Sequence, residues 1–281
     1  MYADYLAAIV LANVLLGLAA YLPLAGGRLL VCVGALAGIG GIAAAVAHVA
    51  GTPLPLALVV GAAASAAAAW VLDLMTRKQS GFEYAITTLA AGEVIRAIVT
   101  NTDRLGGALG FSDTRQVTSL VPMWILGLLA VVCVQLFELS GARRAVAVLR
   151  ESDRLAESLG VDARRMRTKL VVAAGALAGL SGAMQIHLVG IYEPRAFGFD
   201  RSMEILLYAL AGGSVSYLGP VCGAAVLTVM PELLRINPAT RQLGYGALLT
   251  LIMLSRPEGL ATGPWSRPWL RSLVKRSLDT G

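Results

Sequence analysis

The amino-acid sequence predicts an all-α fold, a polytopic bundle of transmembrane helices with about eight membrane segments. Hydrophobic residues make up 57% of the chain and charged residues only 14%, whereas soluble domains carry about 25% charged residues. The apolar residues also form continuous runs of about 20 residues, which is the length that a helix needs to cross a bilayer. A membrane β-barrel would instead need short segments of alternating polarity, and these runs do not alternate.

Apolar runs follow one another along most of the chain. They lie at residues 5–24, 28–50, 54–75, 81–99, 120–139, 170–190, 203–235 and 243–256. The first six are long enough to span a bilayer. We therefore expect a single transmembrane domain over residues 1–281, with one polar loop at 140–169 and a basic tail at 261–281.

The run at 28–50 starts in an unusual way. Gly26 and Gly27 stand directly before Arg28, and further glycines follow within the run. The glycine pair predicts that the chain is unwound where this segment starts, and the later small residues predict close packing against neighbouring helices.

The distribution of lysine and arginine predicts the orientation, because these residues gather on the cytoplasmic side of membrane proteins. With the 140–169 loop inside, sixteen of the 23 Lys and Arg residues fall inside and seven fall outside. The opposite orientation would reverse this ratio. The N-terminus is therefore predicted outside and the C-terminus inside.

The run at 203–235 is interrupted by glycines and a proline. Between residue 190, predicted outside, and the tail, predicted inside, the chain must cross the membrane an odd number of times. If 243–256 is the last crossing, the run at 203–235 has to return to the side on which it began. Two half-length helices would do so as a re-entrant pair near 203–235, and the alternative is a turn between two thin, tilted spans. Broken helices often line a transport pathway. The candidate pathway residues are Thr87, Thr88, Gly212, Gly213 and Ser214. The threonine hydroxyls either face a polar solute or bond back to their own helix.

The polar loop at 140–169 is predicted to contain a short amphipathic helix. Asp153 is a candidate N-cap, and Leu155, Ala156 and Leu159 fall on one apolar face. Gly160 suits the end of this helix, and Asp162 suits the start of the next. Such a helix fits either a groove on a soluble partner or the membrane surface.

Motifs of nucleotide binding and hydrolysis are missing from the sequence: it has no GxxxxGK[ST], no GxSxG and no HExxH. His48 and His187 are isolated, which favours packing over metal binding. Glu93 and Arg96 are three residues apart, which favours an ion pair over proton transfer. The basic residues lie beside apolar runs rather than among aromatic residues, which argues against nucleic-acid binding.

Three stretches carry a resemblance to a known family. They are EYAITTLAAGEVIRAIV at 83–99, RAVAVLRESDRLAESLGVDARRMRTK at 144–169, and FDRSMEILLYALAGGSVSYLGPVCGAAVLTVMPELLR at 199–235, followed by YGALLTLIMLSRPEGL at 245–260. The chain resembles the LivM-type permease subunit of ABC importers for branched-chain amino acids, from about residue 20 to residue 260.

The resemblance implies a transport subunit for branched-chain or other hydrophobic amino acids in a bacterial inner membrane, with a periplasmic N-terminus and a cytoplasmic C-terminus. A LivH-type permease would complete the pathway, two ABC ATPase subunits would bind ATP, and a periplasmic substrate-binding protein would deliver the solute. The chain would be no enzyme, with no catalytic residue, metal or cofactor of its own. Coupling to the ATPases would fall to Leu155, Ala156, Glu157, Leu159 and Gly160.

The chain departs from the family at two places. The family's Gly-Gln-Leu-Ser-Leu-Gly-His becomes Gly27–Val33, with Arg28 in place of the glutamine, and its Thr-Gly-Gly-Ser-Asn-Gly becomes Leu105–Gly110. These changes leave the solute open: either a more apolar passage suits a larger hydrophobic solute, or this subunit lines little of the pathway. Urea and short amides are an alternative cargo, because related permeases carry them. Outside this class, an ion-coupled secondary transporter would show internal repeats and buried carboxylates, and a membrane-embedded hydrolase would need a nucleophile–base pair.

Overall fold

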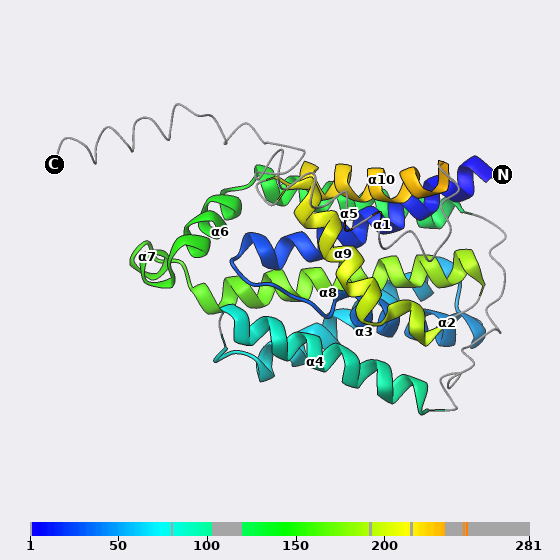
Figure 1. The fold of residues 1–281 in the computed structure, drawn as a ribbon, viewed down its shortest axis with the longest axis horizontal. Coiled ribbons are helices and arrows are strands. Elements are labelled where there is room, and N and C mark those ends of the chain that lie inside the picture. Colours follow the sequence, from blue (N-terminus) through cyan, green and yellow to red (C-terminus); the bar gives the residue numbers. More distant parts are fainter. Residues whose placement is uncertain are drawn as a thin grey trace.

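The structure is a computed structural model, in which residues 2–79, 81–102, 120–190, 193–213, 216–233, 244 and 246 are described. The regular elements in these residues are all helical, and no strand occurs among them. Most helices run roughly along one direction and form a bundle (Figure 1). The predicted segment at 243–256, apart from residues 244 and 246, and the tail at 261–281 lie outside the described residues.

The centre of the bundle is α8 (Ala163–Val189), which packs against α1 (Tyr2–Ala25), α2 (Val33–Val49) and α3 (Leu54–Met75). Small residues allow these helices to approach closely. A Cβ atom added at Gly179 would stand 2.6 Å from the carbonyl oxygen of Gly61, and one added at Gly40 would stand 2.6 Å from the carbonyl oxygen of Gly179. The close packing predicted from the glycines of the second apolar run is therefore confirmed.

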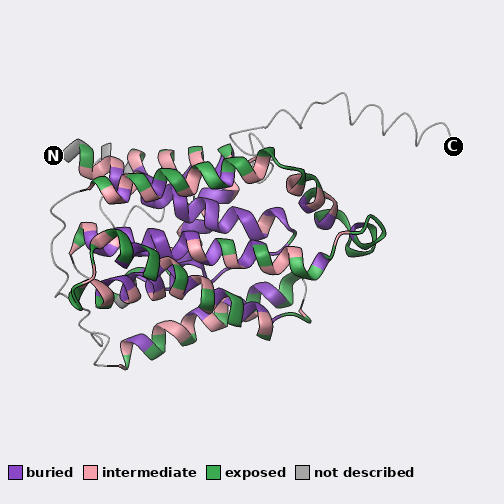
Figure 2. Cartoon of the chain, turned by 180° about the vertical axis from the view of Figure 1, so that it is seen from behind, coloured by how far each residue is buried: buried purple, intermediate pink, exposed green. Residues whose placement is uncertain are grey.

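The outward sides of the outer helices are exposed (Figure 2), and many of the exposed residues are large and apolar. Two outer helices are α4 (Gly81–Thr100) and α5 (Val121–Leu139), and their large apolar side chains are exposed, for example Ile98 and Leu136. A bilayer or a second membrane subunit would cover such a surface.

Four of the described helices are long and apolar enough to cross a membrane. They are Asp4–Ala25, Leu54–Met75, Val121–Leu139 and Ala163–Val189. Two shorter apolar helices lie at Val33–Val49 and Leu218–Met230. The fold class of a polytopic helical membrane protein is therefore confirmed.

Residues 26–32, here called the α1–α2 linker, are not helical. Gly27 has φ +80°, a left-handed conformation that favours glycine, and α2 begins only at Val33. The predicted unwound start is confirmed, and the helix of the apolar run at 28–50 covers only its part from Val33 on. A Cβ atom added at Gly92 would stand 3.1 Å from the Cβ atom of Cys32, so the linker reaches the middle of α4.

The run at 203–235 forms two half-length helices, α9 (Phe199–Gly212) and α10 (Leu218–Leu233), preceded by a 3-10 helix, η3, at Pro194–Phe197. The two helices pack against each other and against α1.

The path of α10 can be followed along α1. The Pro220 carbonyl oxygen lies 3.1 Å from the position of a Cβ atom on Gly17, and Thr228 accepts a hydrogen bond of 2.9 Å from the Asn13 amide. Because Asn13 is nearer than Gly17 to the N-terminus of α1, α10 runs back toward that end (Figure 1). The start of α10 thus lies about two helical turns before α1 ends at Ala25.

The polar loop forms two helices, α6 (Gly141–Glu151) and α7 (Asp153–Ser158). Both lie at the end of the bundle opposite the N-terminus of α1 (Figure 1). The apolar side chains of Val146 and Leu149 are buried on one side of α6, so this helix is held against the rest of the protein.

Candidate functional site

The candidate coupling surface consists of α7 and its C-cap residue Leu159, where two leucines are exposed. The side chains of Leu155 and Leu159 are 49% and 63% exposed, whereas Ala156 is completely buried and packs with Leu149 and Ala163. The prediction that all three apolar residues share one outward face is therefore wrong for Ala156. A six-residue helix between α6 and α8 has to bury one side, and the small alanine occupies that side.

The end of α7 has the geometry predicted for it. Gly160 adopts φ +77°; its N–H donates to the Glu157 carbonyl at 3.0 Å, and the Val161 N–H donates to the Ala156 carbonyl at 2.9 Å. This pair of bonds is a Schellman motif, in which a left-handed glycine ends the helix. Asp162 then accepts from the Arg165 N–H at 2.9 Å, which confirms that it starts α8.

Asp153 does not cap α7, contrary to the prediction. Ser152 takes the N-cap position, without a side-chain cap bond. The Asp153 carboxylate instead accepts two hydrogen bonds from Arg167 of α8, at 2.6 and 2.7 Å. A bidentate arginine–carboxylate pair fixes orientation as well as distance, so it ties α7 to the start of α8.

A second polar cluster ties the loop to the bundle on the other side. Glu138, at the end of α5, accepts from the Tyr21 hydroxyl of α1 at 2.8 Å and from Arg143 of α6 at 3.0 Å. The exposed leucine pair on α7 is therefore carried by a loop that is anchored at both ends.

The threonines predicted to line the pathway lie on α4. Thr88 is buried; its hydroxyl donates to the Ala85 carbonyl of its own helix at 3.0 Å and accepts from the Val31 N–H of the α1–α2 linker at 3.3 Å. Of the two predicted alternatives for Thr88, the bond back to its own helix is the one observed. Thr87 is half-buried, and the assignment of both residues to the pathway stays a prediction.

The glycines at the break between α9 and α10 permit a very close approach. Gly212 lies against the backbone of Gly219, where an added Cβ atom would clash with a carbonyl group. Gly213 has φ +104° and ψ 138°, a conformation that is strained for any residue with a side chain. Ser214, the third pathway residue predicted here, lies outside the described residues.

Replacing Gly213 by alanine is expected to destabilise the protein by about 1–3 kcal/mol because the positive φ becomes strained. Thermal unfolding of the detergent-solubilised protein measures this effect. Gly141→Ala is the matched control, because a Cβ atom there would meet only the Arg144 guanidinium at 3.9 Å. Equal shifts in Tm for the two variants would contradict the prediction.

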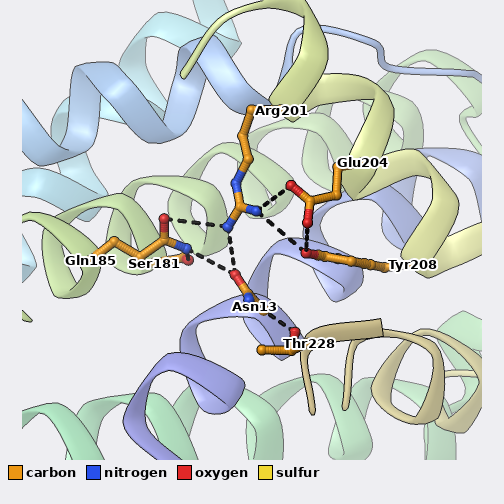
Figure 3. A network of polar contacts seen from close by, with 7 residues as sticks. All are labelled: Asn13, Ser181, Gln185, Arg201, Glu204, Tyr208 and Thr228. Carbon is orange, nitrogen blue, oxygen red and sulfur yellow. Dashed lines mark hydrogen bonds and ion pairs between the residues drawn. The ribbon is translucent and has the colours of Figure 1, made fainter. Parts of the chain in front are cut away.

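A buried polar network joins four helices and was not predicted (Figure 3). Arg201 of α9 donates to Glu204 at 2.6 Å and to Asn13 of α1 at 2.6 Å, and Glu204 also accepts from the Tyr208 hydroxyl at 2.8 Å. Gln185 of α8 donates to Asn13 at 3.1 Å. Since Asn13 also donates to α10, the network holds the α9–α10 pair against α1 and α8.

A signal for this network was present in the sequence. Arg201, Glu204 and Tyr208 are spaced three and four residues apart, which places them on one face of a helix. Arg201 is one of the seven Lys and Arg residues that the predicted orientation places outside, and its side chain is only 16% exposed. The polar residue Asn13 within a long apolar run was the second signal, because a polar side chain buried in a bundle needs a partner.

Glu93 and Arg96 form the ion pair that their spacing predicted, at 2.8 Å. The Glu93 carboxylate also accepts from the backbone N–H of Phe199, the first residue of α9, at 3.0 Å. Glu93 therefore satisfies a free N–H at the start of a neighbouring helix, which supports a structural role.

The two histidines are not isolated in the structure. The His48 and His187 rings meet edge to face, with centroids 5.1 Å apart. Each Nδ1 atom lies within hydrogen-bond distance of a backbone carbonyl, of Thr52 and Ala183 respectively. The pair joins the ends of α2 and α8.

Comparison with known proteins gives a consistent result over most of the chain. The sequence profile described as "Branched-chain amino acid transport system / permease component" matches residues 2–254. The high-affinity branched-chain amino acid transport system permease protein LivM of Salmonella typhimurium is 28% identical over 256 residues, which cover 78% of this chain and 59% of that protein. LivM of Escherichia coli K12 has the same identity and coverage.

A second permease of these systems is also similar. The LivH protein of Salmonella typhimurium is 28% identical over 145 residues, which cover 50% of this chain and 47% of that protein. No solved structure matches the chain. The chain spans about 59% of the length of the LivM proteins. The family profile covers residues 2–254, which is most of this chain. The chain therefore belongs to the family of permease components of branched-chain amino acid transport systems.

Proposed function

We propose that this chain is a permease subunit of an ABC importer for branched-chain or other hydrophobic amino acids. Besides family membership, the observation that carries the proposal is the anchored pair of exposed leucines, Leu155 and Leu159, at one end of an apolar helical bundle. An apolar pair on a short helix fits a groove on a soluble protein. In this function the groove belongs to an ATPase subunit, and residues 140–169 form the coupling loop.

The remaining parts of the importer follow from this assignment. A LivH-type permease would complete the pathway, a second ATPase would bind that permease, and a periplasmic protein would deliver the solute. ATP would be bound by the partner subunits, since this sequence lacks a P-loop motif. The chain needs only two global states that differ in their affinity for its partners.

The proposed topology is multi-pass in a bacterial inner membrane, with a periplasmic N-terminus and with α7 and the basic tail at 261–281 in the cytoplasm. The α9–α10 pair would be re-entrant, because α10 returns along α1 toward the N-terminal end. The tight turn at Gly212 and Gly213 would then lie at membrane depth, where only burial in protein or contact with water tolerates irregular backbone.

Cysteine labelling tests this topology. A cysteine at position 158 is expected to react only with reagent that has reached the cytoplasm, and a cysteine at position 107 with reagent added outside intact cells. The opposite result would overturn the orientation derived from the Lys and Arg distribution.

Uptake by the complete complex in proteoliposomes tests the function. The panel contains leucine, phenylalanine, urea and a short amide, each with and without ATP. ATP-dependent uptake of leucine or phenylalanine is the expected result. If only urea or the amide is taken up with ATP, the protein is still an ABC importer, but the proposed solute is wrong. Uptake that does not require ATP would contradict the proposed importer function.

An ion-coupled secondary transporter is the second candidate, because the described part of the bundle contains carboxylates with little exposure, such as Asp73 and Glu204. Each of them is engaged by an arginine, Arg28 or Arg201, at 3.2 and 2.6 Å. These ion pairs favour a structural role for the two carboxylates over proton transfer.

A further inference from the structure

A buried charged cluster lies where the α1–α2 linker meets α3, α4 and α8. Arg28 of the linker donates to Asp73 of α3 at 3.2 Å, and the second Asp73 oxygen accepts from the Thr168 hydroxyl of α8 at 2.6 Å. The Arg28 guanidinium also lies 4.9 Å from the centre of the Tyr84 ring of α4, within the range of a cation–π interaction. Arg28 and Asp73 are 8% and 1% exposed.

The cluster is joined to α7 through α8. Thr168 follows Arg167, the residue that makes the bidentate pair with Asp153 at the start of α7. Both residues belong to the same regular helix. A displacement of α7 therefore acts on the turn of α8 whose threonine holds Asp73.

The cluster is joined in the other direction to the middle of the bundle. Three residues beyond Arg28, the Val31 N–H donates to Thr88 of α4, and Cys32 packs against Gly92. The first three linker residues, 26–28, still donate backbone hydrogen bonds to the end of α1. Beyond them the backbone is irregular, and the Val31 N–H bonds to a side chain of α4 rather than to a carbonyl of its own segment. The position of the linker depends on the contacts at its two ends.

We propose that Arg28 and Asp73 are positioning residues that transmit the movement of α7 to the α1–α2 linker and to Thr88. The proposal rests on the proposed function, since it takes α7 as the element on which the ATPases act. The chain of contacts runs from Asp153 and Arg167 of α7 and α8, through Thr168, Asp73 and Arg28, to Val31 and Thr88. A buried charge separated from its partner is strongly unfavourable, so the linker follows α3 and α8 rather than detaching from them.

The test uses the complete complex in proteoliposomes, with the natural cysteines replaced and a reporter cysteine at Leu29, a half-buried linker residue. The labelling rate of this cysteine by a small maleimide is compared between the ATP-free and vanadate-trapped states. We expect the rate to differ between the two states in the parent. In Asp73→Asn we expect the difference to be lost and uptake per ATP hydrolysed to fall by about tenfold, within the usual range of coupling between sites.

Two further variants separate transmission from simple stability. Thr168→Val removes the contact between α8 and Asp73 but leaves the ion pair, and it is expected to reduce the labelling difference and the uptake per ATP. Arg28→Gln/Asp73→Asn leaves no unpaired charge and should assemble normally, yet remain uncoupled. A merely structural pair would regain full coupling in this double variant.

The control is Asp162→Asn, which removes one carboxylate from an exposed ion pair with Arg165 near the same loop; asparagine also caps helices well. Normal uptake and labelling are expected. Retention of the Leu29 labelling difference and of full coupling in Asp73→Asn and Thr168→Val would overturn the inference. Failure of the parent chain to bind ATPase subunits would instead refute the proposed function.

Discussion

Leu159→Asp is expected to reduce ATP-driven uptake by about thirtyfold while the helical bundle remains folded. Loss of an apolar anchor at the centre of an interface costs about 2 kcal/mol or more, and Leu159, the C-cap residue of α7, is the more exposed of the two leucines. The same exposure means that the change removes little packing within this chain, and surface substitutions of this kind change stability by about 0.5 kcal/mol or less.

The measurement combines three readouts on the purified complex: uptake in proteoliposomes, the amount of ATPase that co-purifies, and the Tm of the permease. Ala147→Asp is the matched control, because it introduces the same charge at an exposed position of α6 outside the leucine pair. Normal uptake and ATPase recruitment by Leu159→Asp would rule out the docking role of α7. A large fall in Tm would show that Leu159 stabilises this chain instead.

Helix positions could be predicted closely because burial in a bilayer requires a minimum length of apolar sequence. The runs at 54–75, 81–99 and 120–139 became α3, α4 and α5 with ends that differ by no more than one residue. The interrupted run at 203–235 also became two helices with a glycine turn. Glycine and proline break helices through the backbone alone, so the break could be predicted without knowing the neighbours.

The polar contacts could not be predicted in the same way, because they depend on which helices are neighbours. Arg28 was interpreted as a departure that alters the passage, but its partner Asp73 is 45 residues away. Asp153 has the right residue type for an N-cap, but its carboxylate accepts hydrogen bonds from Arg167 instead. Local spacing identifies a residue that needs a partner, while tertiary packing decides the partner.

The burial of Ala156 illustrates the same limit on the candidate site. Spacing placed it with Leu155 and Leu159, because the three residues are close around a helix. The Schellman turn at Gly160 brings α8 back past α7, and Ala163 then packs on Ala156. The proposed docking surface is therefore the leucine pair, and the buried alanine packs against the turn that precedes α8.

The largest expected effect on stability comes from Arg201→Met. The guanidinium of Arg201 donates to Glu204 and to Asn13, both at 2.6 Å, and the Glu204 side chain is only 17% exposed. The methionine would leave this carboxylate buried without its cation, which costs about 3–5 kcal/mol in comparable buried pairs. The measurement is the shift of thermal or denaturant unfolding of the purified protein.

The chain offers a matched control for this prediction. Arg96 and Glu93 form an ion pair with the same three-residue spacing, but their side chains are 35% and 37% exposed, and exposed pairs contribute about 0–1 kcal/mol. Arg96→Met should therefore cost much less than Arg201→Met. Adding Glu204→Gln to Arg201→Met should recover part of the loss, because the unpaired charge is then removed. Equal losses for the two arginine variants, or no recovery in the double variant, would mean that the α9–α10 pair is held against α1 and α8 by packing rather than by this buried network.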